Sequence, residues 1–251
     1  MNKAFLFILL ALICALPRSG HAEIEALTVD LAENHVDITT GFHGSNMVLF
    51  GTKQSRGGDV AVVVRGPKKN MSVRKKNSVL GAWMNTEFLL FKDVPGFYDF
   101  AVSDDIGERI KPNVLKKSGV GFFALVFMPE NKSGYSEKEV QVFQNALIRN
   151  KQKERLFPEQ PKRIRMLNDH FFRTEFYLPA NVPKGEYEIE TLVFQDGEVR
   201  ERSITSMNVE QVGLSASIFR FSKTNGFIYG MICVFLAVLA GWGVNIIRRA
   251  A

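Results

Sequence analysis

The sequence GEYEIETLVFQDGEVRERSITSMNV, residues 185–209, decides which kind of fold the chain can adopt. In its first half apolar and charged side chains alternate, as they do in a strand with one buried face. One face carries Tyr187, Ile189, Thr191 and Val193, and the other carries Glu186, Glu188 and Glu190. Asp196-Gly197 is a pair that two-residue hairpin turns prefer. The stretch therefore predicts a hairpin of two strands, 185–195 and 198–209.

Short apolar segments separated by Gly, Asn and Pro precede this hairpin and predict further strands. The first seven are 27–31, 35–42, 46–52, 59–66, 71–76, 82–91 and 96–103, and one more, 171–178, comes just before the hairpin. Many short strands at regular spacing are typical of an antiparallel sandwich. Pro183-x-Gly185-x-Tyr187 begins the hairpin much as strands begin in immunoglobulin-like sandwiches.

Between the two groups of strands the pattern changes to that of helices. Residues 104–119 are polar, and residues 135–157 have apolar side chains at helical spacing. Ser136 and Glu139 form a capping box at the start of the second segment, and Pro158 is expected to end it. These features predict a helical insertion in the sandwich.

The N-terminus has the order of a secretory signal peptide. Lys3 is followed by an apolar run, 4–16, which is too short to span a bilayer because a span needs about 20 residues. Gly20 and Ala22 supply the small residues of a cleavage site. We therefore expect residues 1–22 to be removed on export.

The C-terminus predicts a membrane anchor. Residues 227–247 carry no charge, and as a helix they would extend roughly 31 Å, the thickness of the hydrocarbon core. Arg248 and Arg249 follow directly and would face the cytoplasm under the positive-inside rule. This arrangement predicts a single-pass protein with an exported N-terminal domain and a cytoplasmic tail, 248–251.

Two further features belong to this anchor. Residues 210–226 join it to the domain, either as a segment that lies flat in the membrane interface or as a short tether. Small or polar residues recur on one face of the anchor helix, where they would let another helix approach closely. This candidate helix–helix interface consists of Gly230, Val234, Ala237, Gly241 and Asn245.

The whole pattern predicts a mainly β fold. We expect an immunoglobulin-like antiparallel β-sandwich, in one or two halves, with a helical insertion and a single C-terminal transmembrane helix. The expected segments are sandwich strands in 23–105, the insertion in 106–165, sandwich strands in 166–209, a juxtamembrane linker in 210–226 and the membrane helix in 227–247.

Composition argues against several classes of function. The formal charge is +6, with 32 basic and 26 acidic residues. Without Lys3, Arg18, Arg248 and Arg249, which belong to the two ends, 28 basic residues remain, so the exported domain is close to neutral. Together with export, this disfavours a nucleic-acid partner. Neither cysteine, Cys14 or Cys233, lies in the exported domain, so a disulfide, covalent haem or thiol nucleophile is not expected there.

Four clusters are candidate ligand sites, and each has a structural explanation that we favour. The clusters are His35 with Asp37 for a metal, Asp104, Asp105 and Glu108 for calcium, the basic run Lys68, Lys69, Arg74, Lys75 and Lys76 for an anion, and the loop 38–45 for a solute. The histidines match no metal motif, and the serines match no nucleophile motif. We therefore predict no catalytic, cofactor-binding or metal-binding residue and no cofactor.

Several stretches resemble a known family. They are DITTGFHGSNMVLFGT, VVVRGP, VRKKNSVLGAWMN, DVPGFYDFAVS, ALIR, FYLPANVPKGEYEIETLVFQDGEV and the terminal AGWGVNIIRR. Together they resemble the putative transmembrane proteins of alphaproteobacteria, over nearly the whole mature chain. The resemblance implies a bacterial inner membrane with a periplasmic domain. It also implies a transport protein, a polytopic permease, as a partner, and it carries over no catalytic residue.

We therefore expect a non-enzymatic, membrane-anchored periplasmic accessory or interaction protein that assists an integral membrane partner such as a permease. The alternatives are a periplasmic solute- or metal-binding module and a hydrolase whose site is assembled from distant residues. Whether the protein forms homo-oligomers stays open.

Overall fold

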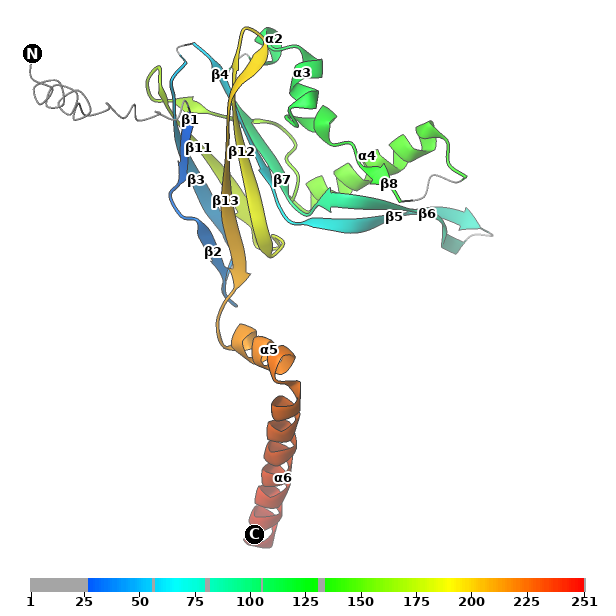
Figure 1. Cartoon of the computed structure of the whole chain (residues 1–251). Coiled ribbons are helices and arrows are strands. Elements are labelled where there is room, and N and C mark those ends of the chain that lie inside the picture. The colour runs from blue at the N-terminus through cyan, green and yellow to red at the C-terminus, as the bar shows by residue number, and fades with distance from the viewer. Residues whose placement is uncertain (1–26, 56, 80–81, 105, 131–133, 251) are drawn as a thin grey trace, which may run out of the picture.

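The computed structural model describes residues 27–250 except 56, 80–81, 105 and 131–133, and it describes the backbone but not the side chains of residues 77, 79, 82–83, 85–86, 214–216 and 243–250 (Figure 1). The predicted signal peptide, 1–22, lies outside the described residues. Strands account for 46% and helices for 28% of the structure. The prediction of a mainly β fold is therefore confirmed.

The first sheet has four strands in the order β1-β3-β11-β10, and every pair in it is antiparallel. Its strands are β1 (Leu27–Leu31), β3 (Gly44–Lys53), β11 (Phe171–Pro179) and β10 (Arg165–Met166). The pairing of β3 with β11 joins segments more than a hundred residues apart in sequence. The sheet can therefore close only after the whole helical insertion has been made.

The second sheet has six strands in the order β2-β13-β12-β4-β7-β9. They are β2 (His35–Ile38), β13 (Glu198–Gln211), β12 (Gly185–Gln195), β4 (Asp59–Arg65), β7 (Tyr98–Val102) and β9 (Lys162–Arg163). The two edge strands, β2 and β9, run parallel to their neighbours, and the inner pairs are antiparallel.

The hairpin of β12 and β13 is confirmed. Asp196 and Gly197 both have positive φ, 55° and 81°, as both central residues of a type I′ turn must. Tyr187 and Ile189 are buried while Glu186 and Glu188 are exposed. From Glu190 to Phe194 every residue is buried, because other parts of the chain cover the outer face of the sheet there.

One apolar core joins the two sheets. Leu49 and Phe176 of the first sheet and Val62 and Ile189 of the second are fully buried members of the same cluster. Strand β4 is buried on both faces from Asp59 to Val64. A strand covered on both faces needs an uninterrupted apolar sequence, which explains the Val-Ala-Val-Val-Val run in β4.

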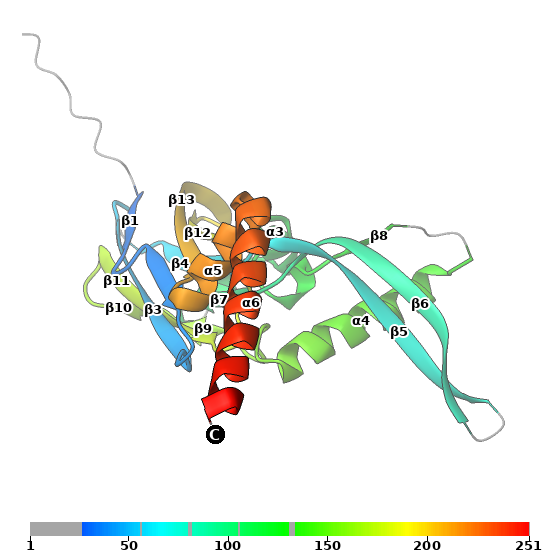
Figure 2. The same ribbon diagram turned by 90° about the horizontal axis from the view of Figure 1, so that it is seen from below.

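A third sheet extends sideways from this body as an arm (Figures 1 and 2). It consists of β5 (Lys68–Val79), β6 (Ala82–Pro95) and β8 (Met128–Pro129) in the order β5-β6-β8. The sequence alone predicts that 71–76 and 82–91 belong to the sandwich. That assignment is wrong, because these strands pair with each other and with β8 rather than with either larger sheet.

Helices fill the insertion and lie beside the arm. They are α2 (Ile106–Arg109), α3 (Pro112–Lys117), the 3-10 turn η1 (Phe122–Ala124) and α4 (Glu137–Lys153). The capping box of α4 is confirmed, since the Ser136 hydroxyl accepts from the Glu139 N–H at 3.3 Å and the Glu139 carboxylate accepts from the Ser136 N–H at 2.8 Å. The helix ends at Lys153, before Pro158, because Arg155 takes a left-handed conformation with φ 58°.

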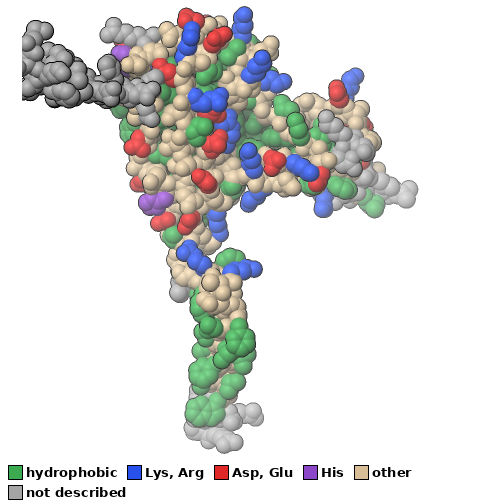
Figure 3. Space-filling view, in the orientation of Figure 1, with side chains coloured by type: hydrophobic (Ala, Val, Ile, Leu, Met, Phe, Trp, Pro, Cys, Tyr) green, Lys and Arg blue, Asp and Glu red, His purple; other side chains and the backbone are tan. Residues whose placement is uncertain are grey.

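Two helices follow the last strand. The predicted linker, 210–226, contains the helix α5 (Leu214–Thr224), and α6 (Gly226–Ala250) follows after a sharp bend. Over the residues with described side chains, neither helix alone is both long and apolar enough to cross a membrane, whereas Ser217–Thr224 and Gly226–Trp242 together meet that test across a bend of 115°. In Figure 3 hydrophobic side chains cover α6, and charged side chains lie over the domain and α5.

Candidate functional site

An open groove lies between the outer face of the second sheet and the helical insertion. It has a volume of about 630 Å³, which falls within the range of roughly 300–1,000 Å³ for small-molecule sites. Its apolar lining includes Phe100 and Val102 of β7, Leu115 of α3, and Val120 and Phe122 beyond it. Groups of this kind can hold an apolar ligand.

Aromatic side chains on β7 hold the far wall of the groove in place. Tyr98, Phe100 and Val102 alternate with Asp99 and Ala101, so they share the outer face of the strand. The rings of Phe100 and Phe122 meet edge to face, with centroids 5.3 Å apart. This geometry is the one that aromatic pairs prefer, and it fastens η1 to the sheet.

Charged residues line one rim of the groove. Lys162 is held by the buried Asp99 through an ion pair of 2.6 Å, and its ammonium group lies 5.1 Å from the centroid of the Phe176 ring. Arg163 is exposed, and its 3.8 Å contact with the exposed Asp104 is weak because water screens it. The guanidinium of Arg163 is thus the rim group best placed to meet an incoming ligand.

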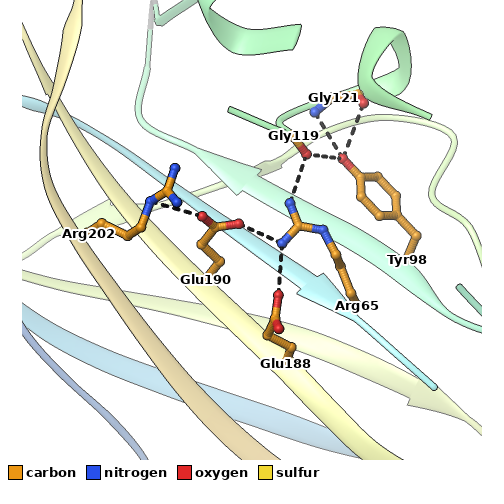
Figure 4. Close-up of polar contacts among 7 residues, drawn as sticks. All are labelled: Arg65, Tyr98, Gly119, Gly121, Glu188, Glu190 and Arg202. Atoms are coloured by element: carbon orange, nitrogen blue, oxygen red, sulfur yellow. Dashed lines mark hydrogen bonds and ion pairs between the residues drawn. The ribbon is translucent and has the colours of Figure 1, made fainter. Parts of the chain in front are cut away.

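A polar network beside the groove fixes its wall (Figure 4). Arg65 of β4 forms ion pairs with Glu190 at 2.6 Å and Glu188 at 3.4 Å, both on β12. The other oxygen of Glu190 pairs with Arg202 of β13 at 3.2 Å. Glu190 is buried, so its charge is stable there only because two guanidinium groups neutralise it.

The same network reaches the loop that forms the wall. Arg65 donates to the Gly119 carbonyl at 3.4 Å, and the Tyr98 hydroxyl donates to that carbonyl at 3.1 Å. The Gly121 N–H donates to the Tyr98 oxygen at 3.0 Å. Burial raises the pKa of Tyr98 well above its usual range, so its hydroxyl remains a hydrogen-bond donor at neutral pH.

Glycine is required at both bonded positions of this loop. Gly119 and Gly121 have φ of 74° and 88°, which side chains of L-residues rarely adopt. A Cβ at Gly119 would also lie 2.3 Å from the Arg65 guanidinium. The pair therefore serves the turn and the close approach of Arg65.

Similarity to known sequences identifies the family of the chain. A family described as "Putative transmembrane protein (Alph_Pro_TM)" matches residues 26–250. The chain belongs to this family. The resemblance stated from the sequence is thereby confirmed. No curated protein matches the chain.

In this member of the Alph_Pro_TM family the sequence-derived metal candidates do not converge. His35 is exposed on β2, and its ring contacts only the neighbouring Asn34 side chain, at 3.3 Å, among the contacts described. Asp104 lies on the groove rim, Glu108 is exposed on α2, and Asp105 lies outside the described residues. Within the described part of the chain no group of three or more His, Cys, Asp or Glu side chains could hold a metal ion.

The basic run has a structural explanation. Its residues Lys68, Lys69, Arg74, Lys75 and Lys76 are exposed on β5, which is an edge strand of the arm. Charged side chains on a sheet edge discourage pairing with another chain. The stretch 38–45 spans the end of β2, the connection 39–43 and the start of β3, and the Phe42 N–H donates to the Thr39 carbonyl at 3.2 Å within it.

The predicted helix–helix interface lies on α6. Gly230, Val234, Ala237 and Gly241 are exposed there, and Asn245 belongs to the part of α6 without described side chains, as do Arg248 and Arg249. Sequence reasoning missed the pairing of Arg65 with Glu190. The usable signal was three glutamates on one face of a strand, which implies cations opposite them.

Proposed function

We propose that the protein is a non-enzymatic accessory, anchored by α6 in a bacterial inner membrane, whose domain works beside an integral membrane partner such as a permease. The exposure of α6 carries this proposal. From Gly226 to Trp242 every side chain except that of Tyr229 is exposed. Soluble monomers rarely expose so large an apolar surface, so a bilayer is the favoured surrounding of α6.

The orientation that we propose puts the domain in the periplasm and the C-terminus in the cytoplasm. Basic residues alone do not choose this orientation, since Arg220 and Lys223 precede α6 and Arg248 and Arg249 end it. The signal-peptide pattern of residues 1–22 supports export of the domain.

We infer an immunoglobulin-like arrangement for the two larger sheets. Two observations support it. Strand β2 pairs in parallel with β13, while the neighbouring β1 pairs with β3 in the other sheet. The Tyr187 hydroxyl near the start of β12 donates to the Pro183 carbonyl at 2.6 Å, as in the tyrosine corner of such sandwiches.

Cross-linking of the full-length chain in its native membrane tests the accessory role. We expect a polytopic protein to co-purify in mild detergent. Gly241→Leu should reduce its recovery without blocking insertion, since a bulky side chain would keep the partner helix away from the stripe. Gly243→Leu is the matched control, because the same change there lies about 200° around the helix.

Recovery of the wild-type chain alone at native expression would contradict the accessory role. Survival of every cross-link in Gly241→Leu would show that the stripe is not the interface. Recovery of a second copy alone would assign the stripe to self-association instead of a permease.

The groove supports a second candidate, a periplasmic solute-binding module. We propose an apolar solute, since the lining is apolar apart from the charged rim. Phe123 is highly exposed beside the groove, where a ligand could stack on it. The metal-binding alternative has no such support among the described residues.

Binding of the apolar fluorescent probe 1-anilinonaphthalene-8-sulfonate to the detergent-solubilised chain tests this candidate. Phe123→Ala should weaken probe binding about five-fold, because an aromatic contact contributes about 1 kcal/mol. Phe88→Ala is the control, since Phe88 is similarly exposed on the arm, away from the groove. Equal affinities for the two variants would show that the groove is not the binding site.

A further inference from the structure

We propose that α5 (Leu214–Thr224) lies flat on the bilayer from which α6 emerges and binds its anionic phospholipids, so that it sets the orientation of the domain. This inference rests on the proposed anchoring by α6. It assigns to α5 a binding surface and a ligand class that anchoring alone does not require.

The domain leaves two apolar side chains partly exposed on one side of α5, and Phe219, 64% exposed, lies on another side. Ile218 and Phe221 are three residues apart, so they lie on one side of the helix. Ile218 is 45% and Phe221 38% exposed. A helix of this pattern, continuous with an apolar anchor, is covered most simply by the membrane surface.

The opposite side of α5 carries two cations. Arg220 and Lys223 lie well away from the apolar face, and the Lys223 ammonium group is 5.8 Å from the centroid of the Phe219 ring. No acidic residue occurs from Gln211 to the C-terminus, so no carboxylate of this segment offsets them. Positive charge beside a membrane helix attracts anionic headgroups.

The bend between the helices gives α5 the required direction. The axes of α5 and α6 differ by 115°. If α6 follows the membrane normal, α5 departs from the membrane plane by about 25°, since 115° exceeds a right angle by that amount. Asn225 alone separates the helices. Its N–H donates to the Phe221 carbonyl at 2.8 Å, and its carbonyl accepts from the Tyr229 N–H at 2.9 Å.

The connection from the domain to α5 is short. Only Val212 and Gly213 separate β13 from α5. The Val212 N–H donates to the Ile38 carbonyl of β2 at 3.1 Å, and Gly213, with φ 101°, makes the turn. So short a link holds the end of β13 within roughly 10 Å of α5. An α5 fixed in the membrane plane therefore also limits the tilt of the domain.

Spin labels on single cysteines in the full-length chain test the proposal. The background carries Cys14→Ala and Cys233→Ser, and the protein is placed in nanodiscs that contain phosphatidylglycerol. Labels at Ile218→Cys and Phe221→Cys should be accessible to oxygen, which concentrates in the bilayer. A label at Ala216→Cys, about 160° from Ile218 around the helix, should instead be accessible to a water-soluble nickel chelate.

The lipid requirement is tested with the Phe221→Cys label. Each cation near an anionic surface contributes about a five-fold preference, or roughly 30-fold for two. We therefore expect this label to lose oxygen accessibility in phosphatidylcholine nanodiscs, and also in phosphatidylglycerol when Arg220→Gln and Lys223→Gln are combined. Equal depth in both lipids would contradict the anionic preference.

A label at Leu239→Cys in α6 separates failure of this proposal from failure of the anchoring. If the α5 labels are as accessible to nickel as Ala216→Cys while Leu239→Cys is deep in the bilayer, α5 is a tether and only this proposal is wrong. If Leu239→Cys is also in water, the anchoring itself is wrong. If the α5 labels are shielded from both reagents, protein rather than lipid covers the helix, and the proposal is again overturned.

Discussion

Replacing Arg65 with Met should destabilise the domain, because the buried carboxylate of Glu190 loses its closest counter-charge. The side chain of Glu190 is only 9% exposed and that of Arg65 is 22% exposed. Removing one partner of a fully buried ion pair costs about 3–5 kcal/mol, because the remaining charge has lost both water and its counter-charge. Met keeps much of the apolar stem of Arg65, so the change acts mainly on the charge.

The expected loss is smaller than that upper range. Glu190 keeps Arg202 at 3.2 Å, although water reaches the side chain of Arg202, which is 55% exposed. We therefore expect Arg65→Met to lower the free energy of unfolding by about 2–3 kcal/mol. For a domain of this size that corresponds to a fall in Tm of roughly 5–10 °C.

Thermal and urea unfolding of the full-length chain in mild detergent, followed by circular dichroism, measures this loss. Lys75→Met is the control, because Lys75 pairs with Glu87 at 3.4 Å where the side chains are 49% and 34% exposed. We expect less than about 0.5 kcal/mol there. If Arg65→Met and Lys75→Met lose the same stability, the network is screened by water and the reasoning is refuted. Adding Glu190→Leu to Arg65→Met should restore part of the loss.

Gly121→Ala should cost about 1 kcal/mol more than Gly119→Ala in urea unfolding, because Gly121, with φ 88° and ψ 177°, lies in a backbone region that essentially only glycine adopts, whereas the Cβ at 119 would meet the movable end of the Arg65 side chain; a larger loss for Gly119→Ala would contradict this reasoning. Burial raises the pKa of Asp99 although Lys162 opposes the rise. The folded state therefore binds this proton more tightly than the unfolded state, and the resulting stability is complete below about pH 4 and is lost as the pH rises through the folded pKa. The urea midpoint of Asp99→Asn should accordingly rise relative to that of the wild type as the pH increases, and a constant difference between pH 4 and 8 would contradict the assignment.

The sequence by itself predicts the structural features that depend on interactions between residues close together in the chain. The Asp196-Gly197 turn, the Ser136–Glu139 capping box and the alternation in 185–190 were all predictable, because each depends on residues within a few positions of one another. The long apolar run of α6 and the family membership were equally evident from the sequence. The predicted linker, 210–226, contains the helix α5, and a single residue, Asn225, separates it from α6.

Only the tertiary structure decided which strands pair and which charges meet. Alternation shows that 71–76 and 82–91 are strands, but it does not say that they pair as an arm rather than join the sandwich, since pairing depends on partners distant in sequence. The groove likewise joins β7 to residues of the helical insertion, and Arg65 meets Glu190 across 125 positions. Such contacts form when separate segments are packed against one core, so no local pattern encodes them.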